Sequence, residues 1–410
     1  MRVWIRVLVG GMLGVLLGAV LGESGGDTPA FFLDAARLVG HIGRYILFAL
    51  VFSNVLVATF EALDNKKMLR IYLQLALYIA IAAAVAVLIG ALSVLVLSPE
   101  RIAIFLEEGS RIEEVAAREI LFEVFPTNVF RSFVTPGNIL LPIFVAGLVI
   151  GAAAYREQQS SGPLVSFFDS MAAVVYRVNS AMIEILGIGL VFVAASFVFS
   201  LRAIDDFSIY ADLVLLTLFV VLFFVLVVYP LIVYLLCGRE SPAKFLLGSA
   251  VPAITSFFSG DVFLALGTSK RIGRENLGHE RVVGSHAYPI ATIFGRVGTA
   301  MVTAIAFFVV LRSYSSLEIS FAQFVWIVAS SFGLSFLLGN VPASGVLVGL
   351  SMMSMWYGQG MEEAYLMLLP VAPLLISLGA LMDTVTSLVI GNIIAYRERL
   401  KREVLMEDFV

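Results

Sequence analysis

Residues 339–345 read Gly-Asn-Val-Pro-Ala-Ser-Gly and interrupt the middle of an otherwise apolar segment, residues 320–358. A second apolar segment, residues 241–273, is interrupted by Ser259-Gly260-Asp261. Glycine and proline end helices for steric and hydrogen-bonding reasons, so each segment predicts two half-helices joined by a tight turn. Unpaired backbone at membrane depth is tolerated only where protein or a water-filled cavity covers it. We therefore expect two re-entrant helical hairpins rather than two membrane spans.

The composition places the whole chain in a membrane. Of its 410 residues 60% are hydrophobic and 14% are charged, with a mean hydropathy of +1.00, whereas soluble domains have about 45–50% apolar and about 25% charged residues. A net charge of −4 gives no case for nucleic acid. The single cysteine, Cys237, excludes an internal disulfide and a cysteine-built metal cluster.

Eight apolar stretches are long enough to cross a bilayer of about 30 Å. The first could be a cleaved signal peptide, but many similar stretches follow it, which favours a first transmembrane helix. We therefore predict an all-α polytopic membrane protein with eight transmembrane helices and two re-entrant hairpins. The spans are 4–22, 42–62, 70–98, 128–154, 165–200, 208–237, 281–312 and 361–396.

Basic residues predict the orientation. If eight spans alternate, Arg2, Lys66, Arg239 and Arg397 fall on one side, and the acid-rich loop 99–127 falls on the other. Cytoplasmic loops carry the excess of lysine and arginine. We expect a multi-pass protein of the inner (plasma) membrane with both termini in the cytoplasm, an extracellular loop at 99–127 and a cytoplasmic tail at 397–410.

The last third of the chain contains an internal repeat of hairpin and span, whose two copies have opposite orientations. Arg296 and Asp383 follow the two breaks at similar distances along the chain and lie inside predicted spans. A charge at the bilayer centre costs about 2.5–3.5 kcal/mol on insertion scales, so both side chains should face the protein interior. Inverted repeats with broken helices are typical of secondary transporters, whose solute lies where the broken tips meet.

Several short motifs resemble the dicarboxylate/amino acid:cation symporter family, which includes the glutamate and aspartate transporters. The resemblance covers most of the chain, and this chain looks like a divergent member. The matching elements are Phe125-Pro126-Thr127-Asn128-Val129-Phe130, the fifth span at 175–189, Thr255-Ser256-Phe257-Phe258-Ser259-Gly260, Gly298-Thr299 and Asn340-Val341-Pro342-Ala343-Ser344-Gly345.

The resemblance implies a bowl-shaped homotrimer that works as an elevator. Scaffold helices 1–2 (residues 1–69) and 4–5 (128–207) would make the trimer contacts. The third helix (70–98) and residues 208–396 would form a transport domain that slides across the membrane. Residues 208–396 hold helix 6, both hairpins and helices 7 and 8.

The departures from the family concern sodium. In the Asn-Met-Asp-Gly-Thr motif of the seventh span, this chain has Gly295 for the asparagine and Val297 for the aspartate, with Arg296 between them. Two of the three serines at the first hairpin tip are Phe257 and Phe258, which either fill volume or line a pocket for a more apolar compound.

The last span allows two alignments to the family. A gap-free match puts Ile376 at the sodium-site aspartate, Gly379 at the substrate arginine, Asp383 at an asparagine and Ser387 at a second aspartate. A register anchored on Asp383 as the sodium-site aspartate puts Thr386 at the arginine. In both, no arginine lies in this span before Arg397, which leaves recognition of an acidic amino acid through that arginine in question.

We hypothesise that the guanidinium of Arg296 occupies space that a sodium ion has in relatives, balanced by Asp383, so that transport is independent of sodium. Three alternatives stay open: a purely structural ion pair, an Arg296 that holds an anionic solute, and an Asp383 that carries a proton. Asp261 is either a solvated turn residue or a ligand. The candidate substrate-binding residues are Ser259, Asp261, Arg296, Thr299, Asn340, Pro342, Ser344, Asp383 and Ser387.

The sequence thus predicts a secondary active transporter of a small organic solute, an amino acid or carboxylate-like compound. The alternative is a non-transporting receptor or an anion-conducting channel on the same fold. We expect no cofactor and no metal ligand set, with a proton as the alternative coupling ion. No enzyme is expected, because the sequence lacks His-Glu-x-x-His and Gly-x-Ser-x-Gly motifs.

Overall fold

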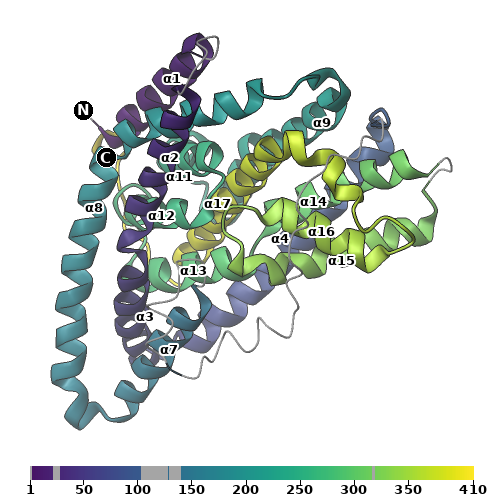
Figure 1. Ribbon diagram of the computed structural model, residues 1–410. Coiled ribbons are helices and arrows are strands. Elements are labelled where there is room, and N and C mark those ends of the chain that lie inside the picture. Colours follow the sequence, from purple (N-terminus) through teal and green to yellow (C-terminus); the bar gives the residue numbers. More distant parts are fainter. Residues whose placement is uncertain (1, 22–27, 103–127, 129–139, 316–318) are drawn as a thin grey trace.

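The computed structural model describes residues 2–21, 28–102, 128, 140–315 and 319–410, and they form a helical protein without a named strand (Figure 1). In chain order its α-helices are α1 (Val3–Leu21), α2 (Thr28–Tyr45), α3 (Leu47–Asp64), α4 (Met68–Leu97), α7 (Leu141–Arg156), α8 (Gln158–Arg202), α9 (Ala211–Phe223), α10 (Tyr229–Leu236), α11 (Pro242–Ser259), α12 (Val262–Glu275), α13 (Arg281–Phe294), α14 (Val297–Tyr314), α15 (Phe321–Leu337), α16 (Gly345–Tyr357) and α17 (Ala372–Arg397).

Seven helical stretches of the described chain are long and apolar enough to cross a membrane. They agree with the expectation of a polytopic membrane protein, although the second stretch, Thr28–Asp64, begins earlier than the predicted span at residue 42. Most of the predicted loop 99–127 and the start of the predicted span 128–154 lie outside the described residues. The described part of that span is α7.

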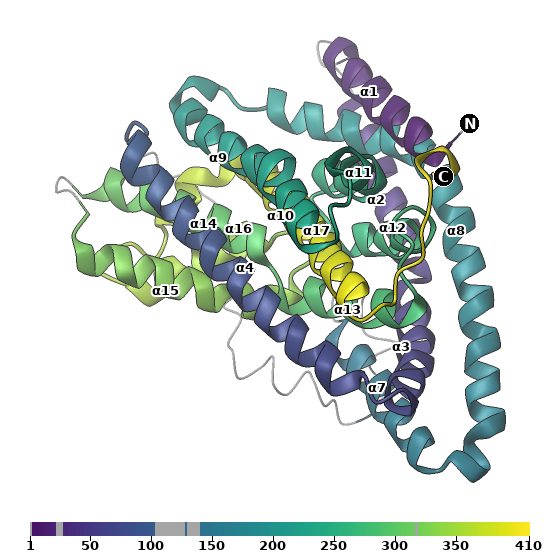
Figure 2. The ribbon, with the colours of Figure 1, turned by 180° about the vertical axis from the view of Figure 1, so that it is seen from behind.

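The 45-residue helix α8 runs along one edge of the molecule (Figures 1 and 2) and packs against α1, α2 and α3. The contact with α1 depends on glycine. A Cβ atom at Gly10 would lie 1.9 Å from the carbonyl oxygen of Gly187, and one at Gly14 would lie 2.4 Å from that of Val191. Small residues spaced four apart let two helix backbones approach closely, which is how helices associate where lipid provides no hydrophobic driving force.

Both predicted breaks are present. The helix pair α11 and α12 is separated by Gly260 and Asp261, where Gly260 adopts a positive φ of 62°. The pair α15 and α16 is separated by a short 3-10 turn, η3 (Leu338–Asn340), and residues 341–344. The glycine and proline residues in the sequence therefore end these helices where we expected.

A third break was not expected. The predicted span 281–312 is two helices, α13 and α14, because the chain leaves the helical path at Gly295 and Arg296. The predicted span 361–396 likewise begins as the 3-10 segment η4 (Ala364–Val371) before α17. Nearly every residue of α14 is buried, and it packs against α17, α4, α15 and α16. In both views α17 runs through the middle of the molecule (Figures 1 and 2).

The two ends of the chain lie together. The Arg2 guanidinium donates to the carbonyl oxygen of Glu407 at 2.6 Å. The C-terminal segment also pairs with the turn between α12 and α13, where the Arg402 N–H donates to the Gly278 carbonyl at 2.8 Å. The predicted tail 397–410 is thus packed against the body of the protein.

His279, in that turn, is 2% exposed and lies between the hydroxyl of Tyr288 (2.5 Å) and the Oδ1 atom of Asn392 (2.9 Å). Burial lowers the pKa of His279 to about 4. In the unfolded chain the His279 imidazole is protonated below about pH 6.5, whereas in the folded protein it is protonated only below about pH 4. His279 therefore destabilises the fold as the pH falls from 6.5 to 4.

We expect the thermal unfolding temperature of the purified protein to drop over this pH range, and to drop less in H279Q. The exposed His41 on α2 offers the matched control, H41Q, which should retain the wild-type slope. Equal slopes in wild type and H279Q would contradict this account.

Candidate functional site: a buried ion pair beside two helix breaks

Arg296 lies at the break between α13 and α14. Its backbone N–H donates to the carbonyl oxygen of Ser335 in α15 (3.2 Å), so a residue of the second broken pair accepts this donor at the break. Glycine at 295 ends α13, and its own N–H still reaches the Ala291 carbonyl (2.8 Å). This arrangement turns the Arg296 side chain into the protein, where it is 2% exposed.

Asp383, on α17, lies against the first turn of α14. Its Oδ1 atom accepts hydrogen bonds from the backbone N–H groups of Gly298 (2.6 Å) and Thr299 (3.1 Å), and its Oδ2 atom accepts one from the Thr299 hydroxyl (2.6 Å). The first N–H groups of a helix have no partner within the helix and attract anions. Asp383 therefore acts as an N-terminal cap supplied to α14 by another helix.

The two charges face each other. The Nε atom of Arg296 lies 3.1 Å from Oδ2 of Asp383, and its Nη2 atom donates to the Thr299 hydroxyl at 3.2 Å. Nε and Nη1 of Arg296 are buried, and neither has a hydrogen-bond partner among the described residues. The pair thus neutralises two buried charges and leaves two nitrogen atoms of the guanidinium without a hydrogen-bond acceptor among the described residues.

Close backbone contact explains the two glycines nearest the pair. A Cβ atom at Gly298 would lie 2.5 Å from the Cβ atom of Met382, and one at Gly345 would lie 2.5 Å from Nη2 of Arg296. Gly298 lets α14 and α17 touch, and Gly345 brings the start of α16 onto the guanidinium. The ion pair therefore lies beside the second break.

The tips of the two broken pairs meet, as the repeat predicted. The N–H of Val262 donates to the carbonyl oxygen of Pro342 at 3.3 Å. Ser259 is half-buried, donates to the Thr255 carbonyl (2.7 Å) and accepts from the N–H of Asp261 (3.2 Å). Phe257 and Phe258 pack edge-on against Phe197 of α8, with ring centroids 5.4 and 6.0 Å from its ring.

Asp261 is not a solvated turn residue, so that expectation was wrong. It is 4% exposed because it caps α12, accepting at Oδ1 from the N–H groups of Phe263 (2.8 Å) and Leu264 (3.3 Å). Its Oδ2 atom accepts from Nε of Arg44 on α2 (2.6 Å), and Nη2 of Arg44 completes the ion pair.

A cavity of about 360 Å³ opens beside the tips. Its walls come from α2, α8, the first broken pair, residue 343 and the start of α17. Polar residues in its lining are Arg37, Arg44, Ser196, Ser200, Ser259, Asp261 and Ser377. Arg296 and Asp383 are buried and do not line this cavity.

Two predicted site residues, Ser344 and Ser387, contribute little to this assembly. Ser344 is exposed and its side chain does not cap α16. The Ser387 hydroxyl donates to the Thr384 carbonyl of its own helix (2.7 Å). The side chain of Asn340 lies outside the described part of the structure.

Sequence reasoning missed Arg44. The signal was present, because Arg44 is a charged residue within the apolar stretch Thr28–Asp64. The predicted span began at residue 42, so Arg44 lay at the predicted membrane boundary, where charged residues are common, and it was not singled out as a site residue.

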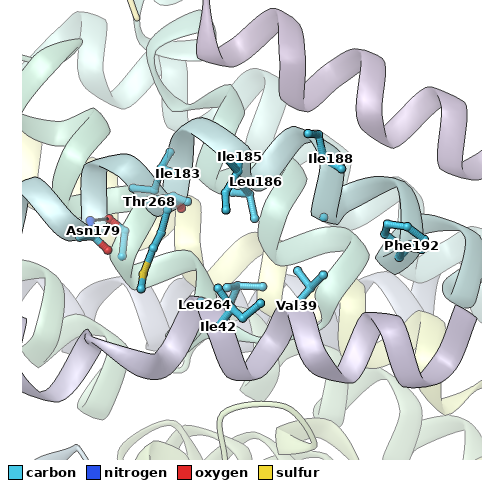
Figure 3. A pocket seen from close by; sticks show the side chains of 14 residues that line it. Val39, Ile42, Asn179, Ile183, Ile185, Leu186, Ile188, Phe192, Leu264 and Thr268 are labelled. Atoms are coloured by element: carbon cyan, nitrogen blue, oxygen red, sulfur yellow. Dashed lines mark hydrogen bonds between the residues drawn. The ribbon is translucent and has the colours of Figure 1, made fainter.

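A second cavity, of about 330 Å³, lies between α2, α8 and α12 (Figure 3). Its lining is apolar apart from Asn179 and Thr268, whose side chains donate to the carbonyls of Gly267 (3.1 Å) and Ala265 (2.7 Å). It carries no charged residue, so it does not suit a charged solute. Among the described residues, no cluster of three or more His, Cys, Asp or Glu side chains forms a metal site.

We expect R296M and D383N each to destabilise the protein by about 3–5 kcal/mol, because each leaves an unpaired buried charge. The double variant R296M/D383N should cost less than the sum of the two singles. Thermal unfolding in detergent measures all three. Additive effects would contradict direct coupling of the two charges.

Comparison with known proteins identifies the family. The profile of the sodium:dicarboxylate symporter family matches residues 3–396. The chain is 22% identical over 211 residues to neutral amino acid transporter A of Bos taurus. The matched region covers 52% of this chain and 40% of that protein. It is 22% identical over 201 residues to excitatory amino acid transporter 4 of Mus musculus, covering 49% and 35%.

The chain therefore matches well under half the length of these curated relatives. The family and its members are transporters and not enzymes. On the match across residues 3–396, the chain belongs to the sodium:dicarboxylate symporter family.

Proposed function

We propose that this chain is a secondary active transporter of a small organic solute, an amino acid or a carboxylate-like compound. The names of its relatives, neutral and excitatory amino acid transporters, supply the solute class. The observation that carries the proposal is the buried Arg296–Asp383 pair, which lies at a helix break beside the meeting point of two further broken pairs. Secondary transporters bind solute at such points.

We further propose that residues 70–98 and 208–396 move as a transport domain against a scaffold of residues 1–69 and 128–207, within a homotrimer in the plasma membrane. The contacts between these two parts include ion pairs, which supports a movable boundary. Arg271 of α12 meets Glu184 of α8 at 2.5 Å, and Arg281 of α13 meets Glu61 of α3 at 3.1 Å. Interfaces between domains that move are more polar than obligate ones, and here the ion pairs accompany buried apolar contacts of α1 and α8 with α11 and α12.

Sodium does not fit the residues at the Arg296 site. A sodium ion needs oxygen ligands without a competing cation, whereas the guanidinium already lies 3.1 Å from Oδ2 of Asp383. Both carboxylate oxygens also accept hydrogen bonds from Gly298 and Thr299, and Val297 offers no side-chain oxygen. Arginine is always protonated, so we propose that Arg296 is a permanent internal cation in place of the ion.

Proteoliposomes with radiolabelled succinate, L-aspartate and L-alanine test this function. We expect saturable uptake of at least one probe, at a rate that changes less than about twofold when choline replaces sodium, since Arg296 takes the place of the ion at this site.

R296M should abolish this uptake, because it leaves Asp383 without its cation. R312Q, which changes an arginine at the far end of α14, should transport normally. Strong sodium dependence of the wild type would contradict the internal cation. Current without saturation would contradict a carrier and favour a channel.

A further inference from the structure

Arg44 and Asp261 form an ion pair between two parts of the chain that the proposed function assigns to the scaffold and the transport domain. Arg44 lies on α2, and Asp261 lies at the tip of the first broken pair, 217 residues later. The Arg44 side chain is 25% exposed and the Asp261 side chain is 6% exposed. Both residues line the cavity beside the tips, and the guanidinium is the more exposed of the two groups.

The charges of this cavity favour an anion. Arg37 and Arg44 both line it, and Asp261 is the one acidic residue among its lining residues. Four serines, Ser196, Ser200, Ser259 and Ser377, add hydroxyl groups, and α17 begins at its wall with Pro373 and Ile376. A small carboxylate matches this lining better than a cation or an apolar molecule.

The two oxygens of Asp261 have separate partners. Oδ1 caps α12 through the N–H groups of Phe263 and Leu264, and Oδ2 pairs with Arg44. Loss of the Arg44 contact would therefore leave the cap in place and the tip folded. An incoming carboxylate can take the position of Oδ2 on the guanidinium without unfolding α12.

We propose that Arg44 recognises the carboxylate of an anionic solute as it enters, and that Asp261 holds this position on Arg44 while the solute is absent. The solute carboxylate exchanges with Oδ2 of Asp261 on the guanidinium, and no covalent bond changes. The inference rests on the proposed function and names its solute class, a small carboxylate. It also gives this chain an arginine that can bind the solute carboxylate, since its last span has no arginine before Arg397.

The test compares R44Q, R44K and D261N in proteoliposomes with radiolabelled succinate. R44Q should raise the KM for succinate about tenfold, because a charge-assisted hydrogen bond is lost, and R44K should recover part of this loss. D261N should lower the KM, since it removes the competing carboxylate while its amide oxygen still caps α12. Arg202 is an exposed arginine at the end of α8 that does not line this cavity, so R202Q is the control and should keep the wild-type KM.

Thermal unfolding of each variant shows whether the fold is intact. Opposite shifts in KM for R44Q and D261N support the exchange. If R44Q and D261N shift the KM in the same direction while the wild type still takes up succinate, the Arg44–Asp261 pair is only a structural contact. That result would overturn this inference and leave the proposed function standing. Wild-type uptake of L-alanine without uptake of succinate would overturn the anionic solute and leave transport standing, because L-alanine carries no net charge. Wild-type protein that takes up no probe would contradict the proposed function and this inference together.

Discussion

A charged side chain buried in the protein needs an opposite charge or hydrogen bonds from other buried groups. At the Arg296–Asp383 pair, several groups provide them together. The guanidinium provides the opposite charge at 3.1 Å, the first turn of α14 provides two backbone donors, and Thr299 provides a hydroxyl. Each of these contacts requires a particular backbone path. The break at residue 295, the start of α14 and the close contact of α14 with α17 at Gly298 are all consequences of placing these charges together.

The same solution recurs at the first tip. Asp261 caps α12 as Asp383 caps α14, and each carboxylate also pairs with an arginine from elsewhere in the chain. Two helix N-termini that could attract an external anion are thus neutralised by the protein's own carboxylates. The difference lies in access, because the Arg296 side chain is 2% exposed and that of Arg44 is 25% exposed. We assign the buried pair to an internal charge balance and the accessible pair to solute recognition.

Much of this arrangement could be predicted from the sequence, because it depends on local rules. The glycine and proline residues located both tip breaks, and the rarity of buried charges singled out Arg296 and Asp383. The break inside the predicted span 281–312 could not be predicted. It is stabilised by a hydrogen bond from the Arg296 N–H to Ser335 of another helix, and this contact exists only in the packed structure. Arg44 was missed for a related reason. Its partner Asp261 is distant in sequence, and neither residue reveals the pairing until the helices are packed.

The family is named for sodium, yet at the Arg296 site the residues present suit a resident cation. On the function proposed above, Arg296 takes over the energetic role of the ion, and this charge is supplied once at folding rather than at every transport cycle. Equilibrium binding of radioactive ²²Na⁺ to the purified wild-type protein tests this most directly. The account predicts no saturable binding in the presence or absence of succinate. Saturable ²²Na⁺ binding that unlabelled sodium displaces would contradict it.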